Sequence, residues 1–254
     1  MAEQDFQGRT AIITGATRGI GLGIAAELVA RGASMCITAR KPDELDSAVA
    51  ELDPQSTGRV IAARGSADDA DHQQAAIAAT LEAFGRIDFM VNNAAVNPVF
   101  GPMMDYELAA VRKIFEVNVV AALAWTQLAW KAWLKDNGGA VLNVASIGGL
   151  RAGPFLGAYN ASKAALIHMT QQLAQELSPG VRVNGIAPAV VKTQFARALY
   201  EKDEEAAAAR YPLQRLGVPT DTAKLAAFLL SDDASWITGQ TVAIDGGILS
   251  AGGV

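Results

Sequence analysis

The chain has 254 residues, of which 51% are hydrophobic and 19% are charged, and its formal net charge is −5. This composition is typical of a globular protein with a large core and excludes a disordered chain. The acidic balance argues against a nucleic-acid binder, and no apolar run approaches the ~20 residues that cross a membrane.

Short β-branched segments alternate with longer Ala- and Leu-rich segments along the chain. Strands are predicted at 10–14, 34–39, 59–64, 87–94, 140–146, 181–188 and 240–247. Helices are predicted at 19–32, 43–52, 71–85, 106–135 and 158–177, with a last helix before the seventh strand. Repeated β-α units predict an α/β fold, a single doubly wound Rossmann-type domain over 1–254. Its seven-stranded, mostly parallel sheet would carry helices on both faces.

The segment at about 190–218 interrupts this plan because it is charged and Ala-rich. Ligands of doubly wound sheets bind outside the carboxyl ends of the strands. We therefore interpret the segment as a helical flap over a site, with a solvated helical pair as the alternative.

The first strand runs directly into the glycine-rich turn "TGATRGIG", which contains Gly15, Gly19 and Gly21. Glycines permit a tight turn and close approach of backbone to phosphate, and the following helix offers free N–H groups. The turn predicts a dinucleotide site.

Charge at the end of the second strand indicates which dinucleotide binds. An acidic residue there would bind the ribose 2′-OH of NAD, but this chain has Arg40 and Lys41, with Arg18 in the glycine loop. Arginine pairs well with a 2′-phosphate, so we expect NADP(H), with NAD(H) as the alternative cofactor. The other interpretation is that these are plain surface arginines.

Tyr159 and Lys163 lie one helical turn apart in "AYNASKAAL", separated by small residues. A free phenol has a pKa near ~10, and a nearby ammonium is expected to lower it toward the working range. Together the two side chains predict proton transfer to or from a substrate oxygen.

Several motifs occur together in order: TG-x3-G-I-G, "NNAA" at 92–95, Asn118, Ser146, Tyr159-x3-Lys163 and "PAVVKT" at 188–193. Over essentially the whole chain this set resembles the short-chain dehydrogenase/reductase family. The resemblance implies that Tyr159 donates the proton, Ser146 holds the substrate oxygen, Asn118 holds a water that serves Lys163, and Lys163 also binds the nicotinamide ribose. It implies further cofactor contacts from Thr17, Ile20, Asn92, Ala94, Pro188, Val191 and Thr193.

Two positions depart from the family pattern. After the third strand, "ARGSADD" leaves either Ser66 or Asp68 to meet the adenine, and we assign Ser66. Ala189 stands where the family mostly has glycine, and its methyl group could crowd the nicotinamide.

Residues near the expected site are apolar, and we assign the substrate pocket to Val96, Phe100, Ile147, Phe155 and Phe195. Such a lining suits a ketone, aldehyde or acyl chain. The chain resembles both 3-oxoacyl-(acyl-carrier-protein) reductases and NADP-dependent carbonyl and retinal reductases. In "LKDNGG" Asp136 stands beside Lys135, and "LSPGV" has no arginine before Val181, which makes docking of an acidic carrier protein doubtful, so we expect a small-molecule substrate.

We therefore expect an NADPH-dependent reductase. A dehydrogenase that oxidises alcohols is the first alternative, and a dinucleotide-sensing binding protein without catalysis is the second. The family resemblance also implies a homotetramer. The only cysteine, Cys36, cannot form an internal disulfide, and because no Cys/His cluster has metal-ligand spacing we expect no metal site.

Neither end of the chain carries a targeting signal, so we expect a cytoplasmic protein.

Overall fold

One seven-stranded parallel sheet forms the centre of the protein in the order β3-β2-β1-β4-β5-β6-β7. The computed structural model describes residues 4–251, so the predictions for the ends of the chain at 1–3 and 252–254 lie outside it. The strands are β1 Thr10–Thr14, β2 Ser34–Ala39, β3 Val60–Arg64, β4 Phe89–Asn92, β5 Gly139–Val144, β6 Val181–Pro188 and β7 Thr241–Ile244.

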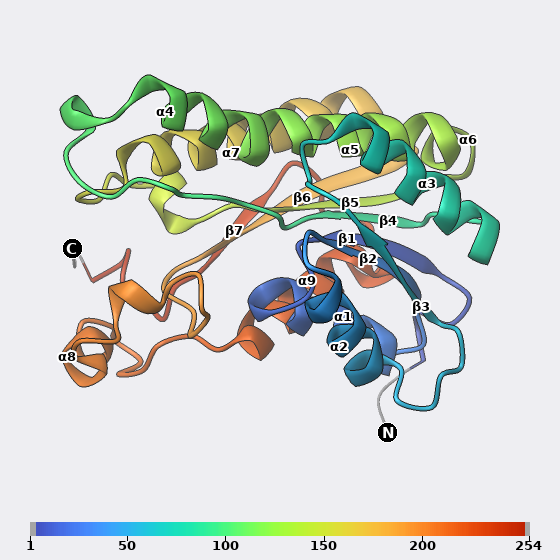
Figure 1. The fold of residues 1–254 in the computed structure, drawn as a ribbon, viewed down its shortest axis with the longest axis horizontal. Coiled ribbons are helices and arrows are strands. Elements are labelled where there is room, and N and C mark those ends of the chain that lie inside the picture. The colour runs from blue at the N-terminus through green and yellow to red at the C-terminus, as the bar shows by residue number, and fades with distance from the viewer. Residues whose placement is uncertain (1–3, 252–254) are drawn as a thin grey trace.

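Helices cover both faces of the sheet (Figure 1). One face carries α1 Gly19–Ala30, α2 Pro42–Leu52 and α9 Pro219–Leu230. The other carries α3 Ala70–Phe84, α4 Leu108–Phe115, α5 Ala121–Ala129, α6 Lys135–Asn137 and α7 Gly157–Leu177. The predicted doubly wound Rossmann-type fold is confirmed, and every neighbouring pair of strands runs parallel.

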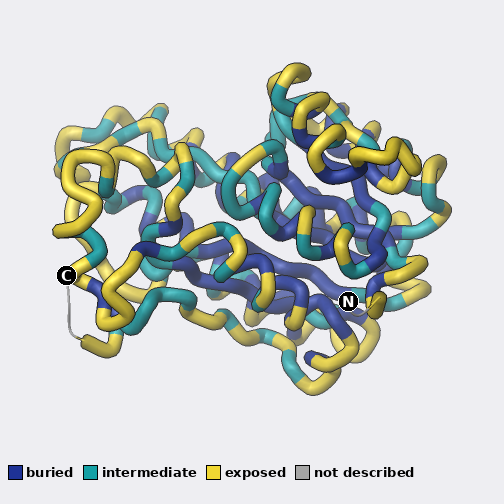
Figure 2. The backbone as a smooth tube through the Cα atoms, turned by 90° about the horizontal axis from the view of Figure 1, so that it is seen from below, coloured by how far each residue is buried: buried dark blue, intermediate teal, exposed yellow. Residues whose placement is uncertain are grey.

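Burial follows from this layering. The central strands are buried along nearly their whole length, while the outer surfaces of the helices are exposed (Figure 2). A strand covered on both faces needs apolar side chains on both, which is why "TAIIT" and "SMCITA" read as continuous runs. Two clusters of buried side chains, one on each face of the sheet, form the core.

The helix predicted at 106–135 is found as one helical run from Leu108 to Asn137, and two π-helical stretches interrupt it. They span Glu116–Val120 and Trp130–Leu134. A π turn inserts an extra residue into an α-helix and is frequent at functional sites. Asn118 lies in the first of them.

The segment after β6 contains little regular structure. A 3-10 turn at Arg197–Leu199 and the short helix α8, Glu204–Ala209, lie at one end of the molecule, beyond the sheet layers (Figure 1). Within residues 4–251, no helix is long and apolar enough to cross a membrane, and no cluster of His, Cys, Asp and Glu could hold a metal ion.

Asp88 fixes the beginning of β1 beside that of β4. Its buried carboxylate accepts hydrogen bonds from the Thr10 backbone N–H at 2.8 Å and from two guanidinium nitrogens of Arg86, each at 2.7 Å. Arg9 lies 3.6 Å away and also pairs with the exposed Asp232 at 3.2 Å.

Replacing Asp88 with alanine should lower the free energy of unfolding by about 3 kcal/mol, because a buried N–H and a guanidinium lose their acceptor. Urea denaturation measures this loss. Asp232→Ala removes the exposed partner of Arg9 and should change stability by less than about 0.5 kcal/mol. Equal losses in the two variants would show that Asp88 has no special structural role.

Candidate active site

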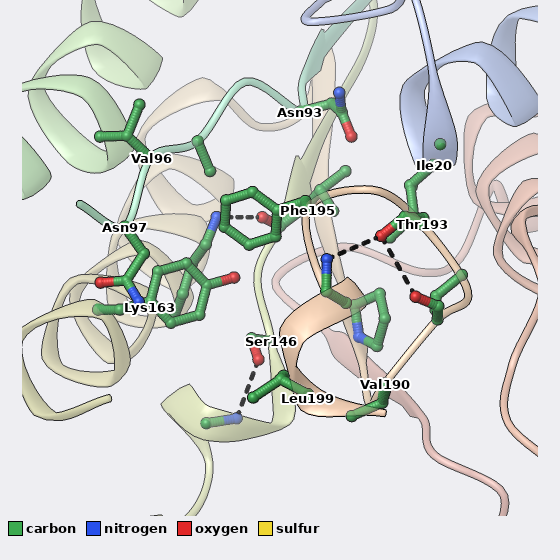
Figure 3. Close-up of a pocket in the computed structure, with 18 of the residues that line it drawn as sticks. Ile20, Asn93, Val96, Asn97, Ser146, Lys163, Val190, Thr193, Phe195 and Leu199 are labelled. Atoms are coloured by element: carbon green, nitrogen blue, oxygen red, sulfur yellow. Dashed lines mark hydrogen bonds between the residues drawn. The ribbon is translucent and has the colours of Figure 1, made fainter. Parts of the chain in front are cut away.

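A cavity of about 750 Å³ lies at the carboxyl ends of the strands (Figure 3). Most of the predicted site residues line it: Gly15, Thr17, Arg18, Gly19, Ile20, Arg40, Lys41, Ser66, Ala94, Val96, Phe100, Ser146, Ile147, Tyr159, Lys163, Pro188, Val191, Thr193 and Phe195. Four predicted residues, Gly21, Asn92, Asn118 and Phe155, do not line it.

The glycine loop is shaped for close approach. Gly15 and Gly19 adopt left-handed φ angles of 65° and 60°. A Cβ atom on Gly15 would lie 3.1 Å from the Ala94 Cα, and one on Gly19 would lie 3.0 Å from the Thr193 Cγ2. The loop therefore presents bare backbone at the start of α1, a cradle that fits the pyrophosphate of a dinucleotide.

Asn93, which the sequence analysis missed, holds this loop in place. Its Nδ2 donates to the backbone oxygens of Thr14 at 2.8 Å and Gly15 at 2.9 Å. A side chain at Gly21 would collide with that amide, so Gly21 makes room for Asn93 and does not contact the cavity. The motif "NNAA" indicated a functional role for this loop, and its second asparagine, Asn93, makes the hydrogen bonds to the glycine loop.

Asn92, predicted to bind the cofactor, instead belongs to the interior. Its Nδ2 donates to Thr126 Oγ1 at 3.0 Å and to Asn143 Oδ1 at 2.9 Å. Asn143 donates in turn to Thr170 Oγ1 at 2.9 Å. A buried polar chain thus connects α5, β4, β5 and α7, because the side chain of Asn92 lies on the sheet face that these helices cover. The side chain of Asn92 therefore does not reach the cavity in which we expected it to contact the cofactor.

Positive charge gathers at one end of the cavity, beyond β2. Arg18, Arg40 and Lys41 line this end together with Glu44, which the sequence analysis did not single out. The Glu44 carboxylate accepts from Arg18 Nη1 at 3.0 Å and from Lys41 Nζ at 2.8 Å. No ion pair involves the Arg40 side chain among residues 4–251.

Ser66 and Ala67 face the cavity, whereas Asp68 stands behind them. The Asp68 carboxylate is engaged by the Ser66 hydroxyl and the Lys113 ammonium. Between the two candidates for the adenine contact, the structure therefore brings Ser66 to the cavity wall.

Tyr159 and Lys163 project from α7 to the middle of the cavity. Lys163 Nζ donates to the Val144 carbonyl oxygen at 2.7 Å and lies 5.7 Å from the centre of the Tyr159 ring. Burial raises the pKa of Tyr159 to about 12, an effect that the Ser146 side chain partly offsets. Burial likewise lowers the pKa of Lys163 to about 7. In the protein without cofactor the pKa of Tyr159 is therefore raised, opposite to the predicted lowering, because desolvation is the largest contribution.

Ser146 combines two roles. Its Oγ accepts from the Gly148 backbone N–H at 3.1 Å and caps the 3-10 turn Ile147–Gly149. Because that bond uses an acceptor lone pair, the hydroxyl proton remains available to donate into the cavity.

Asn118 lies behind the residues that line the cavity. It is buried in the π turn, where its Oδ1 accepts from the Val96 N–H at 2.8 Å and its Nδ2 donates to Ser162 Oγ at 3.0 Å. Nδ2 also donates to the Val96 carbonyl oxygen at 3.1 Å. Asn118 therefore ties the loop after β4 to α7, and its side chain is a positioning group without direct access to the cavity.

Apolar side chains form the other end of the cavity. Phe195 reaches from the segment after β6 towards α7 (Figure 3), and its ring centre lies 6.0 Å from that of Tyr159. Val96, Phe100 and Ile147 contribute further apolar surface. Asn97 also lines the cavity, and its buried Oδ1 has no hydrogen-bond partner within the described chain.

Phe155, predicted to line the pocket, points elsewhere. It has a left-handed φ of 64°, is half exposed and packs on Phe100 with ring centres 5.4 Å apart. The Tyr106 hydroxyl lies 3.0 Å from the Gly101 carbonyl oxygen and 2.9 Å from that of Phe155. This contact, with a Gly101 N–H bond to Phe155 at 3.0 Å, joins the loops after β4 and β5 at the rim of the cavity.

The segment at 190–218 forms a wall of the cavity through Leu199, Ala207, Arg210 and Tyr211, among others. Tyr211 Oη accepts from the Val190 N–H at 3.3 Å and anchors the segment to the end of β6. Ala189 also lines the cavity.

Comparisons with known proteins agree with this geometry. A family model described as enoyl-(acyl carrier protein) reductase matches residues 15–249. Proteins named dehydrogenase/reductase SDR family member 4 are similar along almost the whole chain. The Caenorhabditis elegans protein is 38% identical over 96% of both chains. The human protein is 39% identical, over 94% of this chain and 87% of its own.

Two solved structures are similar in fold. A short-chain dehydrogenase/reductase (glucose/ribitol dehydrogenase) from Brucella melitensis has a TM-score of 0.91 and 32% identity, covering 98% of this chain and 99% of its own. A short-chain type dehydrogenase/reductase from Mycobacterium ulcerans has a TM-score of 0.91 and 34% identity, covering 97% and 91%. This chain therefore belongs to the short-chain dehydrogenase/reductase family, a family of oxidoreductases that use a nicotinamide dinucleotide.

Proposed function

We propose that this protein is an NADPH-dependent reductase that converts an apolar ketone, aldehyde or 3-oxoacyl group to the alcohol. One observation carries the proposal. A single cavity has Ser146, Tyr159 and Lys163 at its centre, with basic side chains at one end and apolar ones at the other. The names of the relatives, which include dehydrogenase/reductase proteins, support this class of reaction.

The chain's own residues supply binding and proton transfer. A nicotinamide dinucleotide bound along the glycine loop would supply the hydride. Tyr159 donates its hydroxyl proton to the substrate oxygen, and Ser146 donates a hydrogen bond to the same oxygen as negative charge develops on it. Lys163 uses one N–H on the Val144 carbonyl, so its remaining donors are available for the cofactor.

In the protein without cofactor, burial raises the pKa of Tyr159 to about 12, so the phenol carries its proton at neutral pH and can donate it. The same hydroxyl would take up the proton in the reverse reaction, and a dehydrogenase that oxidises alcohols is therefore the second candidate.

The apolar end of the cavity supports the proposed substrate class. Phe195, Phe100, Val96 and Ile147 give this part of the cavity an apolar surface that suits an acyl or aromatic chain. Docking of a carrier protein stays disfavoured on sequence grounds, and assembly as a homotetramer and a cytoplasmic location stay predictions.

A panel of carbonyl substrates tests the function. With NADPH, a 3-oxoacyl thioester or an aromatic ketone should be reduced, and a glucose oxidation assay should show no comparable rate. Tyr159→Phe should lower turnover by at least about 10²-fold because the proton donor is lost. Binding of NADPH, followed by its fluorescence, should change less than twofold.

Tyr106→Phe is the matched control, since Tyr106 lies at the rim and does not line the cavity. Its turnover should stay within severalfold of the unsubstituted protein. Near-normal turnover in Tyr159→Phe would overturn the assigned proton donor. A panel in which only a 2-enoyl thioester is reduced would overturn the proposed substrate class.

Cofactor preference is tested at Arg40. Arg40→Asp should lower the ratio of the NADH to the NADPH dissociation constant at least about tenfold, because an acidic residue there repels the 2′-phosphate and accepts from a 2′-OH. Arg59→Asp makes the same charge change just before β3, at the amino end of that strand, whereas Arg40 follows the carboxyl end of β2, and this variant should leave the ratio unchanged. Equal shifts in both variants would indicate a general charge effect.

The buried lysine predicts a pH-dependent stability. Lys163 has its pKa lowered from 10.5 to about 7, so between these values the unfolded chain binds more protons than the folded one. The free energy of unfolding of the cofactor-free protein should therefore rise with pH, on the order of 1 kcal/mol per pH unit between pH 7 and 9. The Cys36 thiol, whose pKa burial raises from 9.0 to about 11, begins to lose its proton in the unfolded chain near the upper end of this window and partly offsets the rise there.

Urea unfolding at pH 7, 8 and 9 measures this dependence. Lys163→Met keeps the length of the side chain without its charge and should remove most of the rise. The same pH slope in both proteins would show that burial of Lys163 does not cause it.

A further inference from the structure

Glu44 occupies the centre of the basic end of the cavity. Three donors from two segments converge on its carboxylate: Arg18 Nη1 at 3.0 Å, Lys41 Nζ at 2.8 Å and Thr17 Oγ1 at 3.2 Å. Thr17 and Arg18 belong to the glycine loop, whereas Lys41 and Glu44 flank the start of α2. All four residues line the cavity.

The same donors would meet a 2′-phosphate. A phosphate and a carboxylate both seek cationic N–H and hydroxyl groups, and two anions cannot share one set of donors without repulsion. The hydrogen bond from Lys41, together with the charge of Arg18, lowers the pKa of Glu44, so the carboxylate stays ionised at neutral pH.

We propose that Glu44 is a specificity-determining residue whose carboxylate holds the 2′-phosphate position in the free protein and must leave when NADP(H) binds. The inference rests on the proposed NADP(H) preference and deepens it. Its consequence is a penalty that falls on NADP(H) and not on NAD(H), because a ribose 2′-OH carries no charge to repel Glu44.

The surroundings allow the exchange. Glu44 lies in the first turn of α2, and about a third of its side chain is already exposed, so rotation towards solvent is open to it. Arg40 makes no ion pair in the described chain and is available to meet the incoming phosphate before Arg18 and Lys41 are released. Glu44 thus determines whether Arg18 and Lys41 are available to bind the cofactor.

Glu44→Gln tests the proposal, because it keeps the shape of the side chain and removes its charge. The dissociation constants of NADPH and NADH are measured by cofactor fluorescence on the substrate-free protein. NADPH should bind about fivefold more tightly to the variant, the effect of one unit charge a few ångströms away in water-like surroundings. NADH binding should change less than twofold.

Asp43→Asn is the matched control. It makes the same charge change one residue earlier, and the Asp43 side chain forms no ion pair with Arg18 or Lys41. Both dissociation constants should stay within twofold in this variant. A NADPH affinity that is unchanged or weaker in Glu44→Gln, or that rises equally in Asp43→Asn, would overturn the role of Glu44.

Failure of the underlying preference gives a different result. If the unsubstituted protein binds NADH more tightly than NADPH, and Glu44→Gln leaves this order and both constants unchanged, the NADP(H) assignment falls together with the inference. If NADPH is preferred from the start but Glu44→Gln has no effect, only the inference falls.

Discussion

The side chains of Asn92 and Asn143 meet across β4 and β5, and the geometry of the site depends on this contact. The two residues are direct partners in the parallel register, and their amides are joined at 2.9 Å. A buried amide without a partner is costly, so any slip of register would leave several polar groups unsatisfied. Because Asn143 also donates to Thr170 of α7, the strand register fixes the helix that carries Tyr159 and Lys163.

The buried positions of Tyr159 and Lys163 carry an unfavourable desolvation energy. Burial pushes the pKa of Tyr159 up and that of Lys163 down, so both side chains are driven towards their neutral forms. Such opposite shifts in neighbouring groups are a feature of active sites. The protein holds Lys163 in place with one strong backbone acceptor, the Val144 carbonyl, at the end of the strand that also delivers Ser146.

Sequence patterns predicted the strands, most helices and the residues that meet at the cavity, because hydrophobic period and glycine spacing report local geometry directly. They could not separate Asn92 from Asn93, since adjacent residues on a strand point to opposite faces and only the sheet decides which face is covered. The orientation of Phe155 depends on a left-handed backbone that a phenylalanine rarely adopts. Glu44 belongs to no recognisable sequence motif. Its position beside Arg18 and Lys41 could not be predicted because these donors come from two separate segments of the chain.

The Tyr106 hydroxyl gives the rim of the cavity a property that its individual loops lack. By contacting the carbonyls of both Gly101 and Phe155, it makes the lengths of the two loops dependent on each other. An insertion in one loop alone would pull its carbonyl out of reach and leave the other without its brace. A change in the length of one loop therefore needs a matching change in the other if the Tyr106 contact is to be kept.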